Sequence, residues 1–164
     1  MNRNLLSLIL TWFLLGGCAS TNQVTQGGGQ QKMISESCKP ATEQEIASLF
    51  NRWNASLQSG DPKRVVANYA AKSILLPTVS NKPRLTAEEK EDYFHHFLEN
   101  KPSGTIEMRY IELGCNTALD AGLYTFTFAR TGAVVKGRYS YTYRWNGSDW
   151  LITSHHSSAM PEKK

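Results

Sequence analysis

The feature that most constrains the fold is a strict two-residue alternation of aromatic side chains near the C-terminus. It runs through Tyr124, Phe126 and Phe128, and again through Tyr139, Tyr141, Tyr143 and Trp145. This period places alternate residues on one face of a β-strand. We predict strands at 105–113, 119–130, 134–145 and 150–157, with tight turns at Thr131-Gly132 and Asn146-Gly147. No helical stretch separates these strands, so we predict an antiparallel sheet.

The residues before these strands predict three helices. Capping boxes pair Thr42 with Glu45 and Thr86 with Glu89, and Asp61-Pro62 begins a short helix between them. One apolar face recurs at helical spacing in the first helix, through Ile46, Leu49, Phe50, Trp53 and Leu57. A short strand is expected at 74–76, before the third helix. The 164 residues suit a single α+β domain, with three N-terminal helices packed on a curved antiparallel sheet.

The first residues have the layout of a secretory signal. Arg3 precedes an apolar stretch at 5–15, and Gly16, Gly17 and Cys18 follow. Residues 15–18 resemble a lipobox, so we predict a lipoprotein signal peptide at 1–17, lipidation of Cys18 and a flexible tether at 18–37. The alternative is an ordinary signal peptide with an incidental cysteine. Lipidation would place the protein in a bacterial cell envelope, membrane-anchored on the extracytoplasmic side. In a double-membraned cell, Ala19 after the cysteine points to the outer membrane.

Two cysteines, Cys38 and Cys115, lie in the remaining 38–164 domain. In an exported protein two such cysteines favour a disulfide, here joining the start of the domain to its sheet. The alternative is a pair of free thiols used in redox or metal chemistry. The sequence contains no Cys-x-x-Cys motif that would support this alternative.

Charge and motifs exclude several functions. The net charge of +4 is modest, and basic residues do not interleave with aromatic ones, so we expect no nucleic-acid partner. No phosphate loop, dinucleotide fingerprint or nucleophile elbow occurs, and we predict no cofactor. His155 and His156 are neighbours on a strand and point to opposite faces, so we predict no metal site there.

A family resemblance covers residues 40–162. It rests on residues 53–55, 60–62, 76–81, 93–94, 114–116 and 120–124, and above all on Trp150-Leu151-Ile152 followed by His155-His156-Ser157-Ser158 and Met160-Pro161. The chain resembles the association domain of calcium/calmodulin-dependent protein kinase II and its free-standing bacterial relatives. These belong to the cone-shaped nuclear transport factor 2-like superfamily, which is also called SnoaL-like and has a cystatin-like fold.

This resemblance implies self-association, at least as a dimer through the sheet face. It implies neither kinase activity nor calmodulin binding, because no kinase motif and no calmodulin-binding segment are present. In the kinase, the association domain has a deep pocket that contains arginines. Here Ser157 stands where the family's final strand carries an arginine.

We hypothesise a pocket for a small anionic molecule, because guanidinium binds carboxylate in a bidentate manner. Its candidate residues are Arg109, Arg138, Tyr93, Tyr124, Tyr139, Tyr141, His155 and His156. The alternative for both arginines is an ordinary salt bridge or an exposed position on the sheet. Relatives with this fold also include isomerases, lyases, cyclases and proteins classed as oxidoreductases.

Catalysis in such relatives needs an acid or base in the pocket. Asp120 and Asp149 look like turn residues, Asp92 lies on the polar side of its helix, and Glu107 shares strand parity with Arg109 and is expected to pair with it. None is an evident catalytic carboxylate. We therefore favour a non-catalytic, self-associating, ligand-binding module over an enzyme or a purely structural envelope lipoprotein.

Overall fold

The structure is a computed structural model that describes residues 37–161. The signal peptide, Cys18 and nearly all of the tether lie outside the described residues. Three helices form one layer: α1 (Glu43–Gln58), α2 (Pro62–Val66) and α3 (Ala87–Leu98). Thr42, Asp61 and Thr86 cap their first turns, and Thr86 and Glu89 complete a capping box as predicted. None of the helices within 37–161 is long and apolar enough to cross a bilayer.

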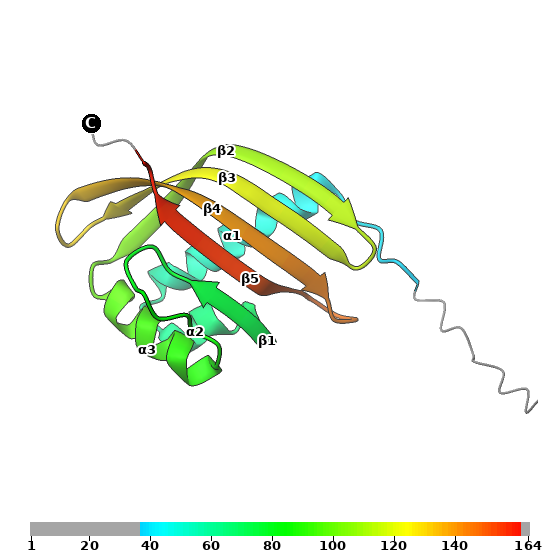
Figure 1. Ribbon diagram of the computed structural model, residues 1–164, viewed down its shortest axis with the longest axis horizontal. Coiled ribbons are helices and arrows are strands. Elements are labelled where there is room, and N and C mark those ends of the chain that lie inside the picture. Colours follow the sequence, from blue (N-terminus) through cyan, green and yellow to red (C-terminus); the bar gives the residue numbers. More distant parts are fainter. Residues whose placement is uncertain (1–36, 162–164) are drawn as a thin grey trace, which may run out of the picture. The chain divides into compact units, whose positions relative to one another are not determined.

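Five strands form the second layer: β1 (Tyr69–Leu76), β2 (Pro102–Gly114), β3 (Thr117–Phe128), β4 (Ala133–Trp145) and β5 (Trp150–Ala159). Their order across the sheet is β1-β5-β4-β3-β2. Figure 1 shows α1 passing behind the sheet, with α2 and α3 gathered beside β1. The strands β2 to β5 form an antiparallel meander, close to the bounds that the alternation predicts.

The prediction of a wholly antiparallel sheet is wrong for β1. This strand pairs with β5 in parallel, with Leu75 opposite His155, and the sheet is therefore mixed. The short strand expected at 74–76, before the third helix, is present as β1 and is longer, so the three helices do not all precede the sheet. Parallel pairing needs a long connection between the two strands. Here α3 and the strands β2, β3 and β4 provide it.

The core between the layers is mainly aromatic. The apolar face of α1 is buried as predicted, and its Phe50 and Trp53 pack on Tyr141 of β4 at ring-centroid distances of 6.3 and 5.8 Å. Tyr141 and Tyr143 are almost completely buried. Tyrosine rings therefore fill the middle of the sheet's inner face, and any open space has to lie to one side of them.

The disulfide between Cys38 and Cys115 is present, with Cα atoms 4.8 Å apart. The backbone N–H of Lys39 also donates to Oδ1 of Asn116 at 2.8 Å. Asn116 adopts a left-handed conformation (φ 56°) in the tight β2–β3 turn. The bridge therefore ties the chain ahead of α1 to the end of the β2–β3 hairpin.

Candidate functional site

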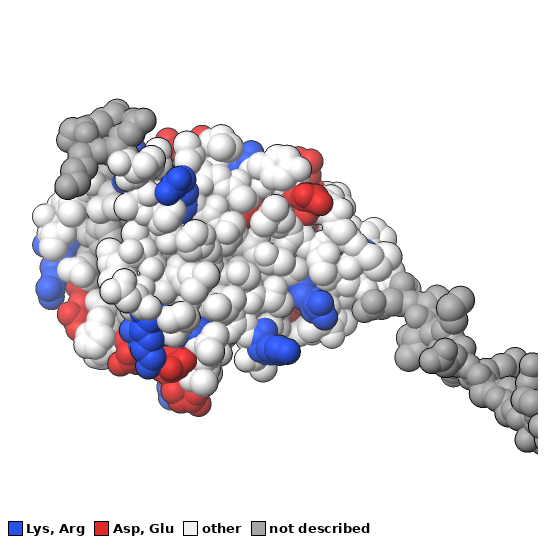
Figure 2. Space-filling view, viewed as in Figure 1, with Lys and Arg blue, Asp and Glu red and all other residues white. Residues whose placement is uncertain are grey.

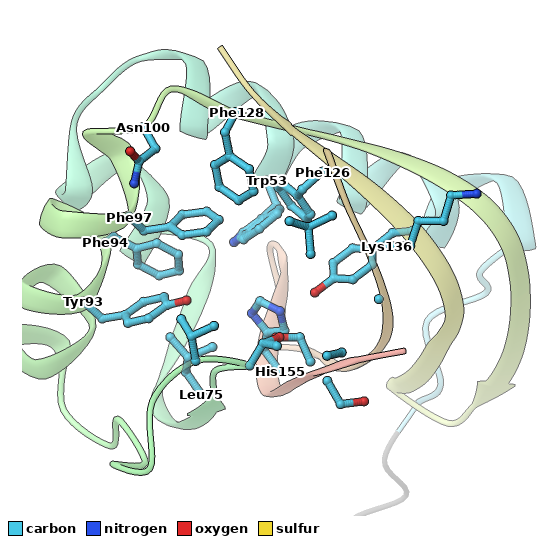
Figure 3. Close-up of a pocket in the computed structure, with 18 residues that line it drawn as sticks. Trp53, Leu75, Tyr93, Phe94, Phe97, Asn100, Phe126, Phe128, Lys136 and His155 are labelled. Carbon is cyan, nitrogen blue, oxygen red and sulfur yellow. The ribbon is translucent and has the colours of Figure 1, made fainter. Parts of the chain in front are cut away.

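A cavity of about 240 Å³ lies between α1, α3 and the inner face of the sheet. Figure 3 shows aromatic rings around it, with His155 of β5 among them. The ring-bearing residues come from α1, α3, β3 and β5 and are Trp53, Tyr93, Phe94, Phe97, Tyr124, Phe126, Phe128 and His155. Leu75, Val79 and Val135 add aliphatic surface. The lining is thus predominantly apolar, as in most small-molecule sites.

Local sequence explains how these rings converge. The period of two in β3 directs Tyr124, Phe126 and Phe128 to the inner face. The spacing of four in α3 stacks Tyr93 on Phe97, whose ring meets Phe126 edge to face at 5.9 Å. Gly137 of β4 leaves room for Tyr124, because a Cβ at position 137 would come within 2.5 Å of the Tyr124 ring.

His155 is a buried polar residue of the lining. It is 5% exposed, and its Nδ1 lies 2.7 Å from the Tyr69 hydroxyl. Burial lowers the pKa of His155 to about 3, so the ring is neutral at pH 7. Burial also raises the pKa of Tyr69 well above its ordinary value, so this hydroxyl keeps its proton. The two residues form a neutral hydrogen-bonded pair.

Besides the ring-bearing residues, the polar residues of the lining are Thr78, Asn100, Lys136, Ser157 and Ser158. The Thr78 hydroxyl donates to Ser157 Oγ at 2.8 Å. The Lys136 side chain points away from the rings in Figure 3. Val79 is 85% exposed and Val135 is 46% exposed, which gives the mouth an apolar rim. Burial raises the pKa of Tyr93 to about 12, so it adds no charge at neutral pH.

Three of the predicted pocket residues line the cavity: Tyr93, Tyr124 and His155. The other five lie outside the lining: Arg109, Arg138, Tyr139, Tyr141 and His156. Arg138 is exposed and donates to Ser158 and Ala159, while His156 lies on the outer face of the sheet. No arginine within 37–161 lines the cavity, so the predicted arginine-lined pocket for an anion is wrong.

Arg109 belongs to a separate buried cluster. Its Nε donates to Oδ1 of Asp120 at 3.1 Å, and the Tyr139 hydroxyl donates to the same oxygen at 2.8 Å. Asp120 is inaccessible to solvent and lies within β3, so its interpretation as a turn residue is wrong. Burial raises the pKa of this carboxyl, although the Tyr139 hydrogen bond opposes the rise.

The expected pair between Glu107 and Arg109 is also wrong. The register of β2 against β3 shifts between Ile106 and Met108, so Glu107 is the extra residue of a bulge and is exposed. Asp120 has the same strand parity as Tyr124 and Phe126. That parity was the signal in the sequence that Asp120 faces inward.

No three His, Cys, Asp or Glu side chains in the described part of the chain lie close enough to share a metal ion. The rings of Trp53, Phe94, Phe97, Phe126 and Phe128 were assigned from the sequence to apolar faces, not to a pocket. Periodicity shows which face a ring is on. It does not show where facing elements leave space.

A curved mixed sheet, helices on its inner face and a cavity between the two layers define the cone-shaped class of nuclear transport factor 2-like proteins. A solved member with a cystatin-like fold comes from Novosphingobium aromaticivorans. It is 12% identical to this chain, with a TM-score of 0.62, and the match covers 73% of this chain and 82% of that one. At such low identity the likeness shows the fold alone.

Residues 42–161 match the model of the calcium/calmodulin-dependent protein kinase II association domain, and the chain belongs to this family. A solved protein of Xanthomonas campestris assigned to this association domain is 42% identical. It superposes with a TM-score of 0.71, and the match covers 79% of this chain and 99% of that one. A comparison with curated protein sequences finds no match.

Proposed function

We propose that this protein is a self-associating module that holds a small, uncharged, largely apolar molecule in its aromatic cavity. The observation that carries the proposal is the cavity of about 240 Å³ with the neutral His155 in its lining. An apolar protein cavity of about 150 Å³ holds benzene. The larger volume here suits a substituted single ring or a molecule of similar size.

The charge of the lining favours a neutral ligand over the anion expected from the sequence. A buried anion needs a cation or several hydrogen-bond donors in compensation. Lys136 is the one cationic residue among the described lining residues, and its side chain points away from the rings (Figure 3). An anion would therefore lose its hydration without gaining a cationic partner.

Matched variants at the cavity rim test this binding. Val135 lines the mouth, whereas its neighbour Val134 is 62% exposed and lies outside the lining. We expect toluene, followed by ligand-observed NMR, to bind the unsubstituted protein and to lose at least tenfold in affinity in Val135→Trp. Val134→Trp should bind as the unsubstituted protein does. Toluene binding that is absent, or equal in all three proteins, would refute the cavity as a binding site.

Self-association is proposed from family membership and from the outer face of the sheet. Figure 2 shows mostly uncharged side chains over the middle of this face, with charged ones mainly around it. Met108 is 51% and Tyr110 is 59% exposed on β2. Aromatic and methionine side chains are enriched at interfaces. Light scattering of the unsubstituted protein should give the mass of at least a dimer. Tyr110→Glu should shift the equilibrium toward the monomer. An unsubstituted protein that is a monomer at high concentration would contradict the proposal.

The location in the cell is a further part of the proposal. Residues 1–17 would direct export, and lipidated Cys18 would hold the protein in the cell envelope, in the outer membrane of a double-membraned cell. The Cys38–Cys115 disulfide supports an oxidising compartment. Mass spectrometry of the membrane fraction should find a chain that starts at a diacylated Cys18. Cys18→Ser should lack the lipid, and an unmodified Cys18 in the native protein would contradict the anchor.

An enzyme of the isomerase or lyase kind is the second candidate. The Tyr69–His155 pair in the cavity favours it, because a positioned imidazole can take part in proton transfer. The low pKa makes His155 a weak base, and no carboxylate among residues 37–161 lines the cavity. Binding therefore agrees better with the geometry than catalysis does. Turnover of a bound molecule that is lost in His155→Phe would reverse this order.

A further inference from the structure

We infer that the cavity selects neutral molecules that carry a hydrogen-bond acceptor, such as a ketone oxygen, and that Nε2–H of His155 is the donor that selects them. This inference rests on the proposed binding function and adds the chemical class of the ligand. It depends on which nitrogen of His155 holds the proton, on where the other nitrogen points, and on the other donors in the cavity.

The proton position follows from Tyr69. Its hydroxyl is buried, keeps its proton and lies 2.7 Å from Nδ1 of His155. Among residues 37–161, Nδ1 of His155 is the only hydrogen-bond partner of this hydroxyl, and the buried indole N–H of Trp53 has no partner. The Tyr69 proton is thus directed to Nδ1, which accepts it. A neutral imidazole that accepts at Nδ1 carries its own proton on Nε2.

The ring of His155 is held in this orientation. Tyr141 packs against it at a centroid distance of 4.3 Å, and Trp53 meets it edge to face at 5.4 Å. A flipped ring would break the bond to Tyr69. No group among residues 37–161 accepts a hydrogen bond from Nε2, and the ring lines the cavity. A buried donor without an acceptor is unfavourable, so a bound acceptor would gain a preorganised partner.

The other polar groups of the lining include bonded and unpartnered ones. The Thr78 and Ser157 hydroxyls bond to each other at the mouth. The indole N–H of Trp53 is buried without a hydrogen-bond partner, and the Asn100 side chain also contributes to the lining. Of the buried donors in the described lining, His155 is the one held in place by a hydrogen bond, from the Tyr69 hydroxyl, so we assign the selection to it, and the His155→Phe variant, which keeps Trp53, tests this assignment.

Matched probes of similar shape test the inference on the intact chain. Acetophenone carries a ketone oxygen, ethylbenzene lacks it, and benzoate carries a charge. We expect His155→Phe to weaken acetophenone roughly threefold to tenfold while ethylbenzene stays equal or tightens. His155→Gln keeps an N–H donor and should recover part of the acetophenone affinity. Benzoate should bind the unsubstituted protein at least tenfold more weakly than acetophenone.

The variants also serve as controls for each other. Any partition of the probes into lipid or detergent is the same for all proteins in one buffer, so it cancels between them. Nitrogen-15 NMR of the unsubstituted protein needs no variant and should show His155 protonated at Nε2 and not at Nδ1. Acetophenone, but not ethylbenzene, should shift the Nε2 signal.

The outcomes separate the two proposals. If none of the probes binds, the proposed binding function fails. If both neutral probes bind but His155→Phe changes them equally, the function stands and the selection by His155 is wrong. A proton on Nδ1, or benzoate as the tightest probe, also overturns the inference.

Discussion

Asp120 and His155 lie on the same rung of the sheet, each paired with Tyr141 on the strand between them, yet their surroundings are opposite. Neighbouring strands are about 4.8 Å apart, so the two backbones are separated by about 10 Å. Asp120 is enclosed by Arg109 and Tyr139, whereas His155 has one neutral partner and faces open space.

The difference shows how one sheet divides its polar groups. The charged carboxylate lies where a guanidinium and a phenol can compensate its burial, with no ligand needed. The cavity instead keeps His155, which remains neutral and offers an unused donor. The Asp120 side of the rung therefore serves the fold, and the His155 side is available for function. Each prediction below tests this division.

Removal of the Asp120 carboxylate should give the largest effect on stability. Asp120→Ala leaves the half-buried Arg109 without its partner, so we expect a loss of about 3 kcal/mol in the free energy of unfolding. Urea denaturation measures this loss. Asp149 is the matched control, because it is exposed in a turn and its removal should change stability by about 0.5 kcal/mol or less. Equal effects at the two positions would mean that Asp120 is not a structural charge.

The second-largest effect should be the contribution of His155 to the pH dependence of the free energy of unfolding. Its folded pKa of about 3 lies below the ordinary value of 6.5, so its contribution is fully present above about pH 6.5 and is lost as pH falls. Below pH 6.5 the unfolded chain binds a proton that the folded chain does not. From pH 7 to pH 5 this amounts to about 2 kcal/mol.

Other groups also titrate in this range, so His155→Phe is the reference. The unfolding free energy of the unsubstituted protein should fall by about 2 kcal/mol more than that of the variant between pH 7 and pH 5. Denaturant titrations at both pH values measure the difference. Parallel pH profiles of the two proteins would mean that His155 takes up its proton at the same pH in the folded and the unfolded chain. The contrast with Asp120 would then disappear.

The sequence predicted the Asp120 side of this contrast less well than the His155 side. Alternation and capping boxes located the helices and the strands β2 to β5, because these signals are local. The parallel pairing of β1 with β5 joins residues far apart in the chain, and nothing within either strand encodes the partner. Asp120-Ala121-Gly122 resembles a turn, but the turn lies at Cys115-Asn116, where the left-handed Asn116 reverses the chain.

The residues of the candidate site also differ in how well the sequence predicted them. His155 and His156 were both pocket candidates because neighbouring residues on a strand face opposite sides, but the pattern did not show which of the two faces inward. Arg109 was a pocket candidate because an arginine on a sheet strand could point into the cone, with an ordinary salt bridge as the alternative, and the structure shows the salt bridge, to Asp120. The bulge at Glu107 shifts the register of β2 by one residue and brings Arg109 to Asp120 instead. A shift of this kind depends on how two strands meet, which a single strand's pattern does not contain.

Two tyrosine variants compare the sides directly and should give the smallest effects. Tyr139 donates to a charged carboxylate and Tyr69 to a neutral imidazole, at 2.8 and 2.7 Å. Hydrogen bonds to charged groups contribute about 1.5–3 kcal/mol and neutral ones about 1 kcal/mol. Tyr139→Phe should therefore destabilise the protein about twice as much as Tyr69→Phe at pH 7, as measured by urea denaturation. Since both changes remove one buried hydroxyl and keep the ring, equal losses would mean that the Asp120 carboxyl is protonated, and the rung would then carry two neutral groups.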